Sequence, residues 1–253
     1  MNIFSSYFIS FFILFFLHTQ QQTFDIDTAR TGQITSASLT NGYTVVFALT
    51  SSPSGLYGQI MKNDGSLYGS EVTLSTSIAG LCQAVPLKDG GFVIVYPNSL
   101  YMGTFAIYEN DFTIRVNSTQ FYISALQSNT LLAVSLQSGG FGIVYRTTTG
   151  NFLWSSYSKT GVLGKQNIQL FVPDIINSIS ETCSLQMLNN NIFLVVRYSL
   201  ASPASAFLKG VIFNENGTLI KSSFIIDPSC PTPTTVACNN RYPDITTTQT
   251  ECG

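Results

Sequence analysis

The sequence predicts an all-β protein, a β-propeller-like array of four repeats of roughly 49 residues, each made of four short strands. Three observations support this fold class. A glycine-led apolar segment recurs at a fixed spacing, turn residues occupy the same place in each repeat, and the central segments lack the polar alternation of a sheet with one solvated face. Part of a larger propeller and a β-sandwich are the alternatives.

The recurring segment begins at one or two glycines and continues as a run of apolar residues. Residues 41–47 (NGYTVVF) recur as residues 90–96 (GGFVIVY) and 139–145 (GGFGIVY), and residues 190–196 (NNIFLVV) form an eroded fourth copy. Gly42, Gly91 and Gly140 are then spaced 49 residues apart both times. A period of this length is typical of propeller blades and solenoid units.

Each repeat contains further elements in a constant order. A short apolar piece ends just before the recurring segment, at Leu39, Leu87, Leu136 and Leu188. A second apolar segment follows at residues 56–60, 102–107, 152–157 and 207–213, and a tight turn comes next at residues 63–65, 110–111, 159–161 and 214–217. The last strand contains residues 71–74, 120–123, 168–172 and 223–226. Because Asp-Gly and Asn-Gly favour hairpin turns, these elements predict an antiparallel meander.

The central segments explain why the repeats would stack. Residues 43–49 and 92–96 are almost continuously apolar, which predicts that both faces of each sheet are covered by a neighbouring blade. The glycine pairs predict a tight turn or a close backbone approach. Gly142 lies inside a strand and predicts a β-bulge.

The repeat resembles the propeller-like repeats of large secreted bacterial adhesins and protist surface proteins. Their pattern is GGFVVVW, then GxYGQxF, DxG and GxEFxV, and the first repeat matches it at residues 42–47, 56–61, 63–65 and 69–74. The tryptophan of the pattern is replaced by Phe47, Tyr96 and Tyr145. The resemblance covers residues 23–227 and implies a role in surface attachment or display.

The chain divides into three parts. Residues 1–22 predict a secretory signal peptide, because residues 3–17 form an uncharged apolar run shorter than the ~20 residues of a membrane-spanning helix. A retained signal anchor is the alternative. Residues 23–227 form the repeat domain, in which residues 23–27 resemble residues 223–227 and predict a strand that closes a four-bladed ring. Residues 228–253 predict a Pro-, Thr- and Cys-containing linker or tail.

Cysteines and glycosylation sequons agree with a secreted or cell-surface protein. The candidates for disulfide bonds are Cys82, Cys183, Cys230, Cys238 and Cys252. Their odd number predicts an unpaired thiol or a continuation of the chain beyond Gly253, which would also be a route to membrane attachment. Asn117 and Asn216 each begin an N-x-Ser/Thr sequon and are the glycosylation candidates.

Composition excludes several functions. Only 9% of residues are charged and the net charge is −2, so no nucleic-acid partner is expected. The one histidine, His18, lies in the predicted signal segment, which leaves no imidazole for base catalysis, and the cysteine spacing fits no zinc site. The sequence therefore predicts no metal, no cofactor and no catalytic residue. Arg146, Arg197 and Glu181 are candidate ligand contacts at or near strand ends.

Two functions are open at this point. The first is a non-enzymatic secreted or cell-surface module for binding, adhesion or extracellular assembly, with an extracellular protein or glycan as partner. The alternative is a secreted propeller hydrolase that acts on glycans with a carboxylate pair at the mouth of the ring. Carboxylates in the predicted turns are expected to be solvated turn residues rather than catalysts: Asp64, Asp89, Glu109, Asp111 and Glu215.

Overall fold

The computed structural model describes residues 34–51, 54–80, 82–122, 126–171, 180–199 and 207–227. Their strands form four antiparallel sheets of four strands each, which we call blades 1 to 4. Blade 1 contains β1 (Ile34–Ser38), β2 (Thr44–Ser51), β3 (Ser54–Met61) and β4 (Leu67–Ser75), and blade 2 contains β5 (Gln83–Pro86), β6 (Phe92–Pro97), β7 (Gly103–Tyr108) and β8 (Ile114–Tyr122). Blade 3 contains β9 (Leu126–Ser135), β10 (Phe141–Thr147), β11 (Phe152–Tyr157) and β12 (Leu163–Phe171), and blade 4 contains β13 (Ser180–Leu188), β14 (Asn191–Ser199), β15 (Phe207–Asn214) and β16 (Leu219–Asp227).

This architecture confirms the predicted propeller-like array of four-stranded repeats, and it is not a two-sheet sandwich. Within each blade the strands follow the chain order, as a meander requires. The predicted signal peptide, the closing strand at residues 23–27 and the tail at residues 228–253 lie outside the described residues. In the described ranges, no helix is long and apolar enough to span a membrane.

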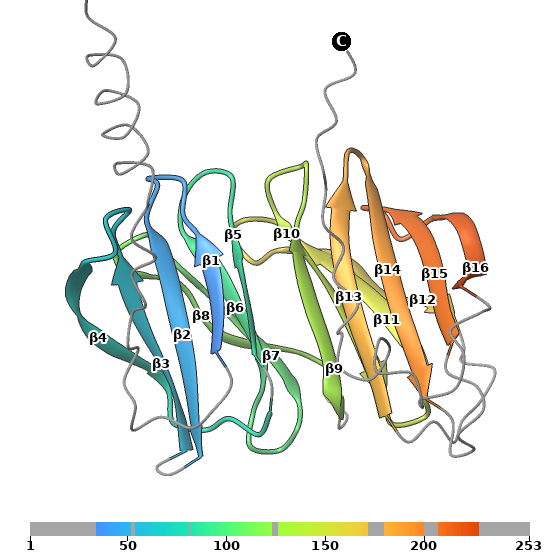
Figure 1. Cartoon of the computed structure of the whole chain (residues 1–253), viewed down its shortest axis with the longest axis horizontal. Helices are drawn as coiled ribbons and strands as arrows, with labels where there is room; N and C mark the ends of the chain where they lie inside the picture. Colours follow the sequence, from blue (N-terminus) through green and yellow to red (C-terminus); the bar gives the residue numbers. More distant parts are fainter. Residues whose placement is uncertain are drawn as a thin grey trace, which may run out of the picture.

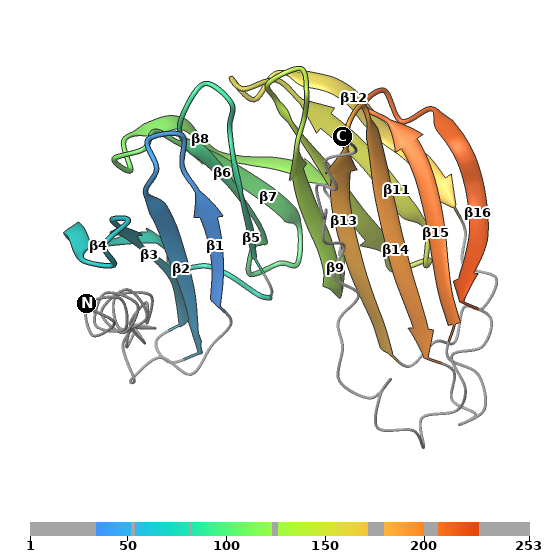
Figure 2. The same ribbon diagram turned by 45° about the horizontal axis from the view of Figure 1, so that its top comes forward.

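The blades stand side by side along an arc, with blades 1 and 4 at its two ends (Figures 1 and 2). The first strands of successive blades contact one another, β1 with β5, β5 with β9 and β9 with β13, so they form the inner edge. The fourth strands form the outer edges. One end of the array holds the connections between blades and the β6–β7 loop, and we call it the connection end. The opposite end, the turn end, holds the β5–β6 and β7–β8 turns and their equivalents.

Three apolar cores hold neighbouring blades together, one between each pair along the arc. Every residue of β6 and of β10 is buried, because blades cover both faces of these central strands. The prediction of double cover is therefore confirmed. Among the described residues, no such core joins blade 4 to blade 1, so these four blades form an open arc rather than a closed ring.

The first repeat is aligned one residue differently from the prediction. The turn before each second strand is closed by the same backbone bond, from Leu39 to Tyr43, from Leu87 to Gly91 and from Leu136 to Gly140. Gly42 therefore corresponds to Gly90 and Gly139, and all three have positive φ. Tyr43 takes the place of the second glycine. Because a slip of one residue moves every side chain of a strand to the opposite face, this alignment decides which residues of β2 face blade 2.

The glycines of the recurring segment allow close packing between strands, and Gly142 does not form a β-bulge. A Cβ atom on Gly91 or Gly140 would collide with the backbone of the adjacent strand, which confirms the predicted close approach. Gly142 pairs regularly with Val134 and Ser156, and the irregularity of β10 lies instead between Tyr145 and Thr147. Gly142 is required because the Trp154 ring occupies the space above it. The prediction of a bulge there was wrong.

Each interface between blades pairs an aromatic ring with a glycine. The pairs are Phe112 on Gly58, Phe105 on Gly161, and Trp154 on Gly217. In the first pair the ring belongs to the turn and the glycine to the strand, and in the other two the roles are reversed. Phe112 has φ of 68° at a position where the equivalent turns have glycine. This backbone conformation is strained for a residue with a side chain, and it is retained here because the Phe112 ring fills the hollow at Gly58.

Candidate functional site

A polar groove lies at the connection end between blades 1 and 2, with a volume of about 240 Å³. Its walls come from the end of β4, from the β6–β7 loop and from the second half of β8. The lining residues are Ser75, Ser77, Tyr96, Asn98, Thr104, Ser118 and Gln120. All of them carry a hydroxyl or a carboxamide, and none carries a charge.

The groove exists because a small residue stands where the next blade has a large one. Ser75 is the last residue of β4 and pairs with Leu56, whereas Tyr122 is the last residue of β8 and pairs with Gly103 at the corresponding place. The ring of Tyr122 lies 4.9 Å from that of Tyr145, between centroids, and fills the space between blades 2 and 3. A serine hydroxymethyl group leaves that space open beside Tyr96.

Hydrogen bonds hold the groove side chains in place. The hydroxyls of Tyr96 and Ser118 are 2.8 Å apart, and those of Ser77 and Ser99 are also 2.8 Å apart. The Asn98 carboxamide oxygen accepts bonds from the backbone N–H groups of Leu100 (2.9 Å) and Met102 (3.1 Å), which turns the loop and fixes the side chain. Tyr96 is only 4% exposed, so the floor is rigid.

This set of groups favours a particular chemistry. Hydroxyls and carboxamides both donate and accept hydrogen bonds, which suits a ligand that carries many hydroxyls itself. A charged ligand would find no opposite charge among the seven lining residues, and burying it there would be unfavourable. The seven lining residues include no carboxylate or imidazole, so these side chains are suited to hydrogen bonding with a ligand rather than to proton transfer.

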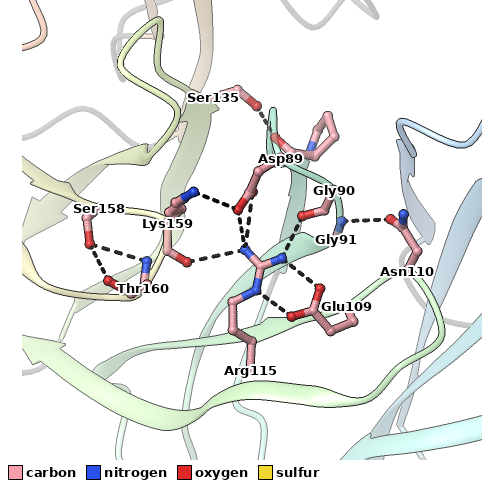
Figure 3. Close-up of polar contacts among 11 residues, drawn as sticks. Asp89, Gly90, Gly91, Glu109, Asn110, Arg115, Ser135, Ser158, Lys159 and Thr160 are labelled. Atoms are coloured by element: carbon pink, nitrogen blue, oxygen red, sulfur yellow. Dashed lines mark hydrogen bonds and ion pairs between the residues drawn. The ribbon is translucent and has the colours of Figure 1, made fainter.

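Two carboxylates at the turn end, Asp89 and Glu109 of blade 2, form ion pairs with Arg115 and Lys159 (Figure 3). Arg115 on β8 donates from Nε and Nη2 to the two oxygens of Glu109, both at 2.7 Å, and from Nη1 to Asp89 at 3.2 Å. Lys159 on blade 3 contacts Asp89 at 3.2 Å. The cluster therefore ties blade 2 to blade 3.

These ion pairs keep both carboxylates ionised. Hydrogen bonds from Arg115 hold the pKa of Glu109 below its ordinary value. Burial acts to raise the pKa of Asp89, but hydrogen bonds from Lys159 and Arg115 outweigh it, so that pKa is also lowered. A general acid of a glycosidase needs a raised pKa, and this pair has the opposite property.

The remaining turn carboxylates stabilise the backbone. Asp64 accepts bonds from the hydroxyl of Ser66 at 2.7 Å and from its N–H at 2.9 Å, and Asp111 accepts one from the N–H of Thr113 at 2.9 Å. These bonds lower the pKa of both carboxyl groups. Glu215 on blade 4 accepts bonds from the backbone of blade 3 at Gln137 and Ser138. Among the described residues, no group of three His, Cys, Asp or Glu side chains is placed to hold a metal ion.

The three candidate ligand contacts lie at the connection end but not in the groove. Arg146 is 3% exposed, donates to the carbonyl of Gly150 at 3.3 Å, and lies 5.8 Å from the centre of the Phe152 ring. Its guanidinium is thus packed within blade 3. Arg197 pairs with Thr182, and Glu181 pairs with Tyr198, on β13 and β14 of blade 4; the structure describes their backbones only. Their role in ligand binding stays a prediction.

The cysteine and sequon candidates are partly placed. Cys82 is buried between blades 1 and 2, where burial raises its pKa to about 12, and Cys183 packs between blades 3 and 4. Both are thiols, so the structure contains no bridge between these two. Cys230, Cys238 and Cys252 lie outside the described residues. Asn117 on β8 and Asn216 in the β15–β16 turn are both exposed.

Sequence reasoning proposed none of the groove residues as a ligand contact. One signal was available: the outer strand ends in Ser75 in the first repeat, but in Tyr122 and Phe171 in the next two. The packing between blades was needed to show that this position faces a gap.

No protein-family model matches the chain, and no curated protein matches its sequence. Its fold is similar to that of several solved structures. The catalytic domain of a GH62 α-L-arabinofuranosidase from Coprinopsis cinerea matches 82% of this chain and 73% of its own length, with TM-score 0.52 and 13% identity. An α-L-arabinofuranosidase from Lactobacillus brevis matches 77% and 71%, with TM-score 0.50 and 13% identity. A protein assigned as an exo-β-1,3-galactanase from Bifidobacterium bifidum matches 79% and 72%, with TM-score 0.53 and 7% identity.

These similarities correct one prediction. The sequence led us to expect a protein that is not an enzyme, but the solved structures that share its fold include glycan-active enzymes. That expectation rested on the missing imidazole and on the assignment of the turn carboxylates to solvated positions, but glycosidases need only a pair of carboxylates and no imidazole. The resemblance to adhesin and surface-protein repeats stays a prediction.

Proposed function

We propose that this protein is a secreted β-propeller-like protein that acts on glycans, with the groove between blades 1 and 2 as part of its glycan-binding surface. The observation that carries the proposal is the uncharged lining of fixed hydroxyl and carboxamide groups around the buried Tyr96. Sugars present hydroxyls in many directions, and residues of this kind pair with them without a charge penalty. The expected ligand is therefore a neutral glycan.

The fold supports an action on glycans in a general way. Arabinofuranosidases and a galactanase use this architecture for hydrolysis, so glycans with α-L-arabinofuranosyl groups and β-1,3-galactan are the first substrates to try. Hydrolysis needs a pair of carboxylates beside the scissile bond, so a glycan in the groove would require them at the connection end. Glu181 is the first one to test, because it stands near the beginning of the inner strand β13, at the same end as the groove.

The substitution Ser75→Tyr tests the groove. It places in blade 1 the side chain that fills the next interface, and we expect it to weaken glycan binding at least about tenfold, the equivalent of losing one or two hydrogen bonds. Binding of β-1,3-galactan oligosaccharides and of arabinofuranosyl oligosaccharides is measured by calorimetry. Ser70→Tyr, an exposed position on the same strand, is the control and keeps wild-type affinity.

Sugar release from the same oligosaccharides tests the catalytic part. Glu181→Gln is expected to abolish release while affinity stays within about twofold, since the change is isosteric and Glu181 is not among the residues that line the groove. Equal binding by wild type and Ser75→Tyr would show that the groove is not the glycan site. Binding without any release by the wild type would remove hydrolysis and leave glycan recognition.

A further inference from the structure

We propose that Asn117 carries an N-linked glycan that lies over the groove and limits access to it. The inference rests on the proposed function for the groove, to which it adds a regulator attached to the same chain. Its basis is an overlap: the sequon is Asn117-Ser118-Thr119, and its middle residue, Ser118, is part of the groove wall.

The position of Asn117 favours its glycosylation and brings the attached glycan close to the groove. Asn117 is exposed on β8, the outer strand of blade 2, where it is open to a bulky substituent. Its Cα lies about 3.8 Å from that of Ser118, as consecutive residues do, so the attachment point adjoins the groove wall. The strand is irregular at this point, because the pairing shifts between Phe105–Thr119 and Ile107–Val116. Asn117 and Ser118 therefore stand together opposite the single residue Ala106, and their side chains do not follow the ordinary alternation between the two faces of the sheet.

The attached glycan also matches the chemistry of the site. Its sugars carry the hydroxyl groups that the lining of Tyr96, Ser118 and Gln120 is suited to bind. A tethered ligand acts at an effective concentration in the millimolar range, which is enough to compete with a weakly bound external glycan. If the tethered sugars leave the groove open about a fifth of the time, the apparent affinity for an external glycan falls about fivefold.

Four forms of the secreted chain are produced in a eukaryotic host that glycosylates proteins. They distinguish an effect of the Asn117 glycan from an effect of the Ser118 hydroxyl and from an effect of glycosylation at Asn216. Asn117→Gln removes the glycan and keeps Ser118, while Ser118→Ala keeps the sequon and removes a groove hydroxyl. Asn216→Gln is the matched control, because Asn216 stands in the β15–β16 turn of blade 4 at the turn end. The wild type is the fourth form, and peptide mass spectrometry measures occupancy at each site.

A readout that needs no ligand keeps the inference separate from the proposed function. Ser77→Cys puts a thiol in the groove, and its labelling by a maleimide is followed with and without the Asn117 glycan. We expect labelling to be about fivefold slower with the glycan present, if the groove is open about a fifth of the time. Ser138→Cys, at an exposed turn of blade 3, labels at the same rate in both forms.

The expected result is an occupied Asn117, slow labelling at position 77, and β-1,3-galactan or arabinofuranosyl oligosaccharide binding that is about fivefold tighter in Asn117→Gln than in the wild type or Asn216→Gln. An unoccupied Asn117, or equal labelling in both forms, would overturn the inference. If labelling is slowed but even Asn117→Gln binds no oligosaccharide, the cover exists and the proposed function is wrong.

Discussion

The interface between blades 1 and 2 and the interface between blades 2 and 3 are built from corresponding strands, yet they differ in what fills them. Between blades 2 and 3, Phe121 and Tyr122 pack on Tyr145, with ring centroids 5.3 and 4.9 Å apart. Between blades 1 and 2, Ser75 leaves a groove beside Tyr96. The comparison teaches that a repeat scaffold can open a groove between two blades where a short side chain replaces a long one.

The two tyrosines that face these interfaces are also held differently. The Tyr145 hydroxyl contacts Asn167 and lies 3.3 Å from that of Ser155, inside the packed interface, and burial raises its pKa to about 12. Tyr96 bonds instead to Ser118, which is exposed at the groove. The packed interface therefore supports stability, and the open one offers polar groups to solvent or to a ligand.

Tyr145→Ala removes the centre of the packed interface and is expected to have the largest effect. The side chain is fully buried, so its loss leaves a cavity and should lower the free energy of unfolding by about 3–5 kcal/mol. Denaturant unfolding measures the change. Tyr68→Ala, at a residue that is 48% exposed, should cost less than about 1 kcal/mol. Similar losses from both substitutions would mean that the interface contributes no special stability.

Tyr122→Ser converts the packed interface into a copy of the open one. Tyr122 is half-buried, so we expect a smaller loss of about 1–3 kcal/mol in the free energy of unfolding, together with a new cavity beside Tyr145. The structure of the variant shows the cavity, and denaturant unfolding gives the energy. A variant as stable as the wild type, with no cavity, would contradict the claim that this residue decides between groove and packing.

Acid should weaken the packed interface slightly through its ion pairs. Asp89 and Glu109 have pKa values lowered from 3.8 and 4.5, so their contribution is present above these ordinary values and is lost as pH falls through the lowered ones. Both are partly exposed, and the effect is small. We expect Arg115→Ala to be less stable than the wild type at pH 7, and the difference to shrink below about pH 4. A difference that stays constant down to pH 2 would assign the loss to packing instead of charge.

The sequence predicts the strands well because their signals are local. Turn residues such as Asp64-Gly65 specify hairpins, and a continuous apolar run specifies a strand covered on both faces. The predicted alignment of the first repeat was wrong by one residue for a physical reason. Matching Gly42 to Gly91 maximises similarity, but the turn hydrogen bond from Leu39 to Tyr43 fixes a register one residue away.

The amino-acid sequence by itself determined the number of repeats, the order of strands in each blade and the need for blades to cover one another, because each depends on residues close together in the chain. Only the tertiary structure decided the rest: the open arc, the burial of Arg146, the ion pairs around Arg115 and the groove beside Ser75. These features depend on which side chains face each other across two blades, and a gap between distant residues leaves no local pattern in a sequence.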